Sequence, residues 1–316
     1  MYCAGVLIIC VFFAFFSPRL LAFPIPDSFV WHIRVFGPQV AYAYAKYAAV
    51  TQLPASERHF VAHRFGADVY AAKGLTGAGI CDEAFDFGCF HGFSTQSIRT
   101  LGAGALPDLI EACKSSSDST IRACEHGIGH GLMEYLGPSK LIDALYACDA
   151  SAQADPLVGC TAGVFMEYNR SILFDAASTS VKTRVPVSSN LLAPCNTEVP
   201  QQYRESCYFE ISLWWKDIFG SDFKRMGNLC SQATKHVEKI SCWRGMGAII
   251  AEESAYSIER ARAACDTLPS ETGSEWCQYG VIARLVGTGT HRESGRVMCE
   301  GLKGEVLTAC RGIFSK

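Results

Sequence analysis

The feature that most limits how this chain can fold is the spacing of its cysteines. Of 16 cysteines in 316 residues, two lie in an apolar first segment, and the others form seven near pairs. In six of these pairs the second cysteine follows the first by 11 or 12 residues. An even number in an exported chain indicates disulfides, whereas thiolate zinc sites prefer the shorter C-x2-C spacing. Neighbour pairing is the simplest connectivity and predicts Cys81–Cys89, Cys113–Cys124, Cys148–Cys160, Cys195–Cys207, Cys230–Cys242, Cys265–Cys277 and Cys299–Cys310.

The pairs recur along the chain with a period near 35 residues. Their second cysteines are 35, 36, 47, 35, 35 and 33 residues apart, which is typical of helix-hairpin repeats. Each unit begins with an apolar segment such as "CQYGVIARLVG" and ends with an amphipathic one such as "SIERARAAC". The sequence therefore predicts an all-α fold of α/α-hairpin repeats, stacked as a solenoid or a closed toroid and stapled by disulfides.

Over residues 57–316 this period and cysteine placement resemble the disulfide-stapled α/α-hairpin repeats of the Sel1-like and tetratricopeptide type. The resemblance implies a curved stack of hairpins with a concave surface, and it implies no particular ligand. A glycine also recurs three residues after the opening cysteine, which predicts that the first helix of each unit crosses a neighbour too closely for a side chain. These glycines are Gly92, Gly127, Gly163, Gly245 and Gly280.

The chain outside the repeats divides into a leader and an extension. Residues 1–22 are predicted to be a signal peptide, because the apolar run from Val6 to Phe16 is short for a membrane span. An uncleaved N-terminal anchor is the alternative, and only then would a membrane be a partner. Residues 23–56 form an N-terminal extension, residues 57–316 the repeat domain, and residues 178–190 an exposed insertion. A cleaved leader places the protein in the periplasm, the secretory lumen or the medium, and a net charge of -3 gives no reason to expect nucleic acid.

Five of the eight histidines occupy two columns in the repeats of residues 57–148. When the segments from Glu57, Cys89 and Cys124 are aligned, histidine stands two residues later in all three and six residues later in two. Residues four apart share one helix face, and packed helices lie about 8 to 10 Å apart, so these imidazoles can meet around an ion. The predicted metal ligands are His59, His63, His91, His126 and His130.

The side chains that remain as possible ligands limit which metal can bind and which chemistry it can perform. With the thiols consumed in disulfides, imidazole and carboxylate remain, which suits zinc, copper or iron at one or two ions per chain. Glu134 follows His130 by four residues and is predicted to be a catalytic proton acceptor, with a ligand or ligand-orienting role as alternatives. The glycines beside the histidines, Gly129 and Gly131, predict that an imidazole, a substrate or another helix comes close to the backbone there. A buried polar network and a pH-sensitive surface are the readings without metal.

These observations favour a metal-dependent enzyme, either a zinc hydrolase or a copper or iron oxidoreductase, acting on an unidentified small-molecule or protein substrate. A metal carrier and a protein-interaction scaffold with structural histidines are the alternatives. The acidic stretch "CDEAFDFGC" adds Asp82, Glu83 and Asp86, interpreted as favourable charge at a helix start, or alternatively as a substrate or metal contact.

Overall fold

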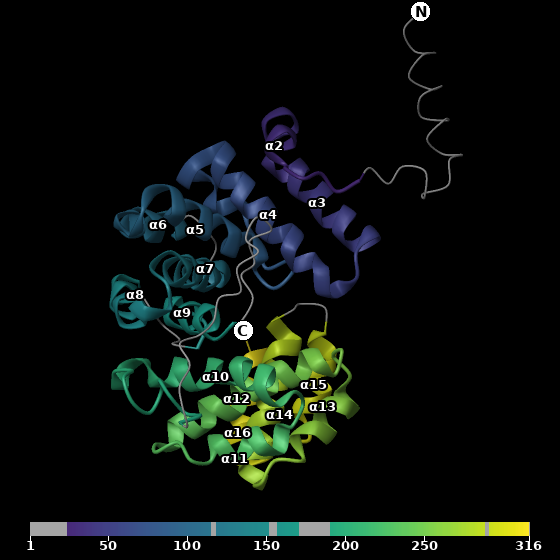
Figure 1. Ribbon diagram of the computed structural model, residues 1–316. Coiled ribbons are helices and arrows are strands. Elements are labelled where there is room, and N and C mark those ends of the chain that lie inside the picture. Colours follow the sequence, from purple (N-terminus) through teal and green to yellow (C-terminus); the bar gives the residue numbers. More distant parts are fainter. Residues whose placement is uncertain (1–23, 115–117, 152–156, 171–189, 288–290, 316) are drawn as a thin grey trace, which may run out of the picture.

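The computed structural model describes residues 24–114, 118–151, 157–170, 190–287 and 291–315, and in these ranges the chain forms helices and turns without a β-strand. The predicted all-α class is therefore confirmed (Figure 1). The predicted signal peptide and all but the last residue of the predicted insertion lie outside the described residues.

The N-terminal extension is helical and packs on the first repeat. Helix α2 (Val30–Phe36) and helix α3 (Pro38–Gln52) both contact helix α4 (Ala55–Lys73). The ring of Tyr42 on α3 stacks on Phe65 of α4 with centroids 4.6 Å apart, and both side chains are buried. This apolar contact covers one side of α4, so the helix lies between the extension and the repeat that follows.

Long helices follow one another through the structure in chain order. Each is the first helix of a predicted repeat, and each packs on the next one in the series. Because neighbours in the series are also neighbours in sequence order, equivalent positions on them come close together. The series is α4, α5 (Gly88–Leu101), α7 (Asp118–Leu136), α9 (Cys160–Asn169), α10 (Arg204–Phe219), α12 (His236–Glu253) and α14 (Glu271–Gly287).

In the sequence, a short helix connects most consecutive long helices and contacts both of them. The exception is α15, which packs against α14 and the terminal helix α16 (Gly304–Phe314). The disulfides join the end of a short helix, or the turn before a long one, to the start of the next helix, and all seven predicted pairs are formed. A staple closing about a dozen residues contributes roughly 3 kcal/mol by restricting the unfolded chain. The short helices are α6 (Leu106–Cys113), α8 (Leu141–Ala147), α11 (Phe223–Cys230), α13 (Ile258–Cys265) and α15 (Arg292–Cys299).

The repeated glycines mark close crossings of the long helices, as predicted. A Cβ on Gly163 of α9 would lie 2.0 Å from the carbonyl oxygen of His126 on α7, and one on Gly129 of α7 would lie 2.0 Å from the carbonyl oxygen of Cys160. The two backbones therefore touch from both sides, with no space for a methyl group. Equivalent approaches occur at Gly66, Gly92, Gly245, Gly247 and Gly280.

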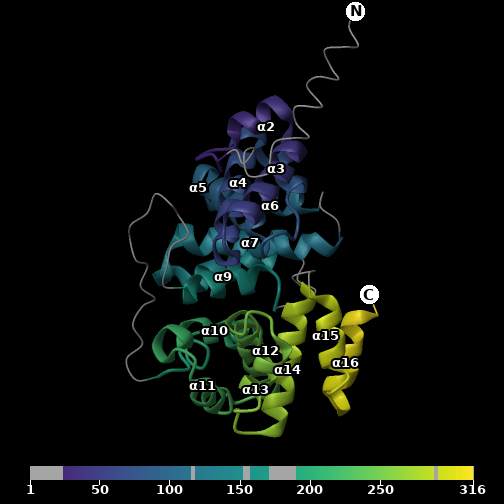
Figure 2. The ribbon, with the colours of Figure 1, turned by 90° about the vertical axis from the view of Figure 1, so that its right-hand side faces the viewer.

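The two ends of the helix series meet. In both ribbon views α2–α9 form the upper part of the molecule and α10–α16 the lower part (Figures 1 and 2). Arg284 on α14 contacts Asp86, in the turn before α5, at 3.1 Å, and it contacts Glu252 on α12 at 2.6 Å. This ion-pair network joins the last long helix to the segment beside the first two.

Candidate metal centre

The five predicted histidines come together from three consecutive long helices. His59 and His63 lie on α4, His91 on α5, and His126 and His130 on α7. The ring centroid of His91 is 5.2 Å from that of His59, 5.4 Å from that of His126 and 4.3 Å from that of His130. The ring of His63 lies 6.1 Å from His59 and 6.2 Å from His91. The close helix crossings place His91 at the middle of the cluster.

Three of these side chains have the geometry of a metal site. His91, His126 and His130 are 3%, 8% and 3% exposed, and each offers one nitrogen such that the three nitrogens lie within 4.8 Å of one another. Nitrogen ligands on a tetrahedral ion with bonds of about 2.0 Å are about 3.3 Å apart. The rings therefore need to move by only about an ångström or two to bind one ion, which their χ angles can supply.

Buried nitrogens in this group lack hydrogen-bond partners. Among the described residues, nothing donates to or accepts from Nε2 of His91 or Nδ1 of His126. A buried polar atom without a partner is uncommon and points to a missing group at the site. A metal ion would bind the lone pairs of these nitrogens, so the residues present fit a transition metal.

The other ring nitrogens are held by groups that orient the imidazoles. His59 donates from Nδ1 to the carbonyl oxygen of Phe85 at 2.8 Å. Nδ1 of His130 lies 3.2 Å from Oε2 of Glu167 on α9, and both side chains are 4% exposed. Metal-binding histidines commonly donate their second nitrogen to a carbonyl or carboxylate, which fixes the tautomer that leaves the other nitrogen for the metal.

The pKa values of four histidines in the cluster keep their rings neutral near pH 7. Burial lowers the pKa of His59 to about 4, and Arg170 adds to the effect. Burial also lowers the pKa of His63 to about 3, with His59 as the next cause. The pKa values of His91 and His126 are lowered well below the usual range by burial and then by His130. Neutral imidazoles carry the lone pairs that a metal requires.

Glu134 is held by two side chains of the neighbouring helix α5. Its carboxylate accepts hydrogen bonds from Arg99 at 2.5 Å and from Thr95 at 3.3 Å, both on α5. The side chain is 21% exposed, at the outer end of the histidine stripe. Its role as a proton acceptor stays a prediction.

The glycines beside the histidines have a structural explanation. Gly129 faces the backbone of α9, as described above, and a Cβ on Gly131 would lie 2.9 Å from the Ile98 side chain and 3.0 Å from the Ser94 carbonyl oxygen of α5. Of the three predicted neighbours, another helix is therefore the correct one at both positions.

Charged side chains of the later helices include a buried carboxyl group that interacts with Arg170 and Arg284, the same two guanidinium groups that act on His59. Glu210 on α10 is 3% exposed, and burial raises its pKa to about 8, against the opposing effect of Arg170 and Arg284. Asp86 forms an ion pair with Arg284, one of the two guanidinium groups that act on Glu210. Asp82 instead bonds to Lys46 and to Tyr42, each at 2.7 Å. Within the acidic stretch, Asp86 therefore connects to the ion pairs of α14, and Asp82 connects to the N-terminal extension.

Sequence reasoning missed several residues of the interior, and their positions in the repeat could have shown them. Met166 stands six residues after Cys160, in the same column as His63 and His130. Glu210 stands in the column that is glycine in five other units. A buried carboxyl group stands here where those five units have glycine for close packing of helices. Such exceptions to the repeat pattern concentrate at functional sites.

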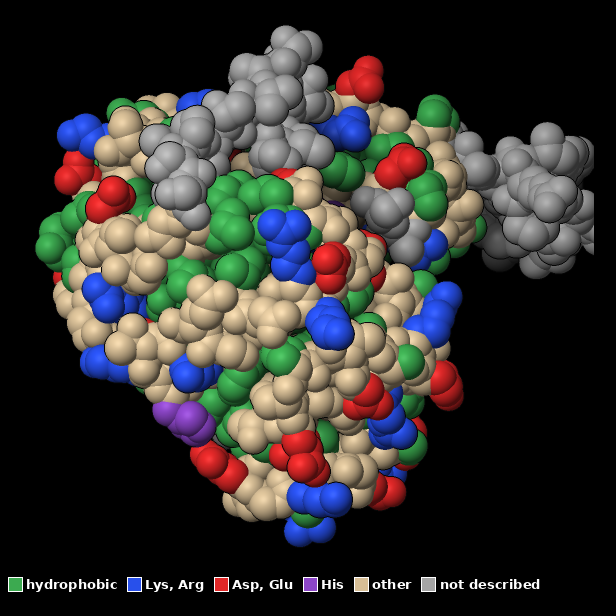
Figure 3. Space-filling view, turned by 60° about the horizontal axis from the view of Figure 1, so that its bottom comes forward, with side chains coloured by type: hydrophobic (Ala, Val, Ile, Leu, Met, Phe, Trp, Pro, Cys, Tyr) green, Lys and Arg blue, Asp and Glu red, His purple; other side chains and the backbone are tan. Residues whose placement is uncertain are grey.

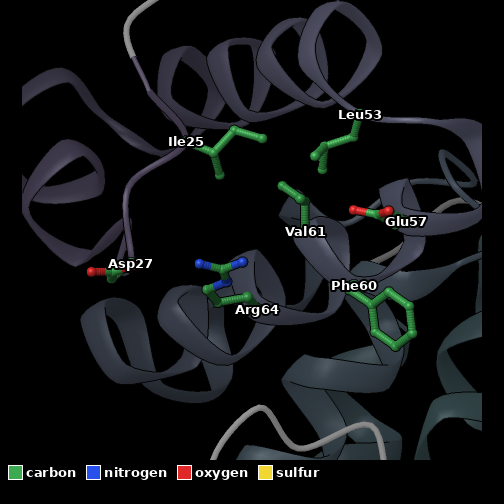
Figure 4. A pocket seen from close by; sticks show the side chains of 7 residues that line it. All are labelled: Ile25, Asp27, Leu53, Glu57, Phe60, Val61 and Arg64. Carbon is green, nitrogen blue, oxygen red and sulfur yellow. The ribbon is translucent and has the colours of Figure 1, made fainter.

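A pocket of about 310 Å³ lies elsewhere, between the N-terminal segment and the start of α4 (Figure 4). Phe60 and Arg64 line it, and these residues are on a different face of α4 from His59 and His63. It is therefore separate from the histidine cluster. Its full lining is Ile25, Asp27, Leu53, Glu57, Phe60, Val61 and Arg64.

The charge distribution on the surface and the hydrophobicity of the helices are relevant to the partners this protein can bind. On the face shown in Figure 3, acidic and basic side chains are interspersed, without a field of one sign. Within the described ranges, no helix combines the length and the apolar character needed to cross a bilayer.

Comparison of the chain with family models, with curated proteins and with solved structures gives no match in any of the three.

Proposed function

We propose that this protein is an exported metal-binding helical-repeat protein in which the five-histidine centre holds a transition-metal ion for catalysis. The observation that carries the proposal is the buried group of His91, His126 and His130, with three donor nitrogens within 4.8 Å. Seven disulfides support an oxidising compartment outside the cytosol. The metal is zinc, copper or iron, and His59 and His63 extend the set toward further ligands or a second ion.

An ion pair between the two ends of the helix series supports the toroidal form of the predicted stack over an open solenoid. Arg284 bonds to Asp86 and so connects the end of the series to its beginning. Burial lowers the pKa of His59, and Arg170 and Arg284 add to this effect, so both guanidinium groups act on the centre. A closed ring would surround the histidines on all sides, which suits a reaction protected from bulk water better than it suits metal exchange with a partner.

Catalysis, rather than storage of the metal, is supported by ionisable groups on the helices around the centre, of which Glu210 interacts with the same Arg170 and Arg284 that act on His59. A bound metal would activate water or oxygen and polarise a substrate. Glu210, with its pKa raised to about 8, holds a proton near neutral pH and can deliver it to a substrate. Glu134 is the candidate proton acceptor, once its hydrogen bonds to Arg99 and Thr95 give way to substrate.

The binding part of this proposal is tested by equilibrium dialysis of metal-free protein against zinc, copper and iron, each in turn. We expect one or two ions per chain in the wild type, and loss of most of this binding in the His126→Ala, His130→Ala variant. The matched control is His236→Ala with His291→Ala, on later helices, which should keep full binding. A wild type that takes up no zinc, copper or iron, or a control variant that loses its metal, would contradict the proposal.

The catalytic part is tested by the coordination of the bound ion. A catalytic metal keeps one position open, whereas a structural metal is fully coordinated by protein. In protein loaded with cobalt(II), azide should therefore change the visible spectrum. If Glu134 is a proton acceptor and not a ligand, Glu134→Gln should leave this spectrum and the metal content unchanged. An azide-insensitive spectrum would favour a scaffold with a structural metal.

A further inference from the structure

The thioether sulfur of Met166 on α9 contacts the histidine centre. Its Sδ is 3.2 Å from Nε2 of His130, across the contact between α9 and α7. Met166 occupies the repeat column that holds His63 in the first unit and His130 in the third. The helix that follows the histidine helices therefore presents a sulfur donor in the column where α4 and α7 present imidazole and α5 has Thr95.

The position of the proton on the His130 ring determines whether its contact with Met166 can be a hydrogen bond. A carboxylate accepts hydrogen bonds, so the contact of Nδ1 with Glu167 at 3.2 Å places the proton of the neutral ring on Nδ1. Nε2 then directs its lone pair at Met166, and a thioether sulfur is itself only an acceptor. Neither atom offers a hydrogen to the other, whereas a cation between them would bind both.

The distance also fits shared coordination. With metal–nitrogen and metal–sulfur bonds of about 2.0 and 2.3 Å, two donors 3.2 Å apart subtend an angle of roughly 95° at the ion. The Arg170 guanidinium approaches the same sulfur at 3.4 Å. The methionine side chain is flexible, and a small rotation that lengthens the distance between its sulfur and Nε2 of His130 opens the angle toward the tetrahedral value.

We propose that Met166 is a ligand of the metal bound by His130 and makes the centre selective for copper(I) over zinc. This inference rests on the metal centre proposed above and specifies its metal. Thioether ligands select copper(I), whereas zinc prefers imidazole, thiolate and carboxylate. No cysteine thiolate is available among the described residues, because all fourteen described cysteines are in disulfides, so Met166 is the soft donor at this site.

The test is a pair of competition titrations on the oxidised full-length protein. Copper(I), kept reduced by ascorbate without oxygen, is titrated against a chromophoric copper(I) chelator, and zinc against a zinc indicator. Met166→Leu keeps the volume and removes the sulfur, and it should weaken copper(I) binding at least tenfold while zinc affinity changes less than threefold. Met226→Leu, at a fully buried methionine in α11, is the matched control and should change neither affinity.

X-ray absorption of the copper(I)-loaded wild type gives a second readout that does not depend on a variant folding. We expect a sulfur scatterer at about 2.3 Å beside imidazole nitrogens. A wild type without that sulfur, or a Met166→Leu variant with unchanged copper(I) affinity, would overturn the role of Met166 and leave the metal centre standing. A wild type that binds neither copper(I) nor zinc in these titrations, and no iron in dialysis, would contradict the proposed function as well.

Discussion

Replacing Gly163 by alanine tests whether the close helix crossings hold the centre together. A Cβ at this position would lie 2.0 Å from the carbonyl oxygen of His126 and 3.1 Å from the backbone nitrogen of His130. Carbon and oxygen in contact need a little over 3 Å, so α9 must move away from α7 by about 1 Å. Overpacking a core with a group that can move typically costs 1–3 kcal/mol. Because the obstacle here is helix backbone, we expect Gly163→Ala to lower the free energy of unfolding by about 3 kcal/mol or more.

Gly312 on α16 is the matched control, because a Cβ there meets nothing within 4 Å. Alanine has the better helix propensity, so Gly312→Ala should stabilise the protein by about 0.5–1 kcal/mol. Both variants are compared by guanidinium denaturation with the disulfides intact. Because the same shift separates Met166 and Glu167 from His130, Gly163→Ala should also weaken metal binding. A Gly163→Ala protein as stable as the wild type would refute the argument from close packing.

Two further predictions concern buried charge. The pKa of Glu210 is raised to about 8 in the folded protein from 4.5, so unfolding releases a proton between these values and stability falls as the pH rises through this window. Glu210→Gln should therefore be increasingly more stable than the wild type from pH 5 to pH 8, by up to a few kcal/mol. A difference constant with pH, or equal to that of the exposed control Glu300→Gln, would contradict this. Asp86→Asn removes the charge paired with Arg284 but tolerates the positive φ of 57° at this position, and it should cost about 1–2 kcal/mol in denaturation experiments. Glu83→Gln, at an exposed neighbour, should have almost no effect.

The sequence was most informative where one physical cause repeats. The cysteine pairs recur because each hairpin is stapled in the same way, so their spacing predicted the connectivity. Gly163 and its equivalents recur because backbones cross at the same step of each unit, and this too was predicted. The histidine columns followed from the same register, since His59, His91 and His126 stand at equivalent positions of neighbouring helices.

The features that were not predicted depend on contacts between distant segments. Glu134 continues the histidine stripe in sequence, but its carboxylate is paired with Arg99 on the neighbouring helix. Glu167 approaches His130 because two glycines let α9 come close, which no spacing within α7 could show. The contact of Asp86 with Arg284 requires the two ends of the helix series to meet, and the period alone leaves open whether they do.

The most direct test of the metal centre is an anomalous-scattering difference map from crystals of metal-loaded protein, collected on both sides of the metal absorption edge. We expect a peak about 2.0–2.2 Å from nitrogen atoms of His91, His126 and His130, and no comparable peak at His236 or His291. The peak should be missing from crystals of the His126→Ala, His130→Ala variant loaded in the same way. Fully loaded crystals with no peak among these three imidazoles, or with the ion bound only at surface histidines, would contradict the central claim.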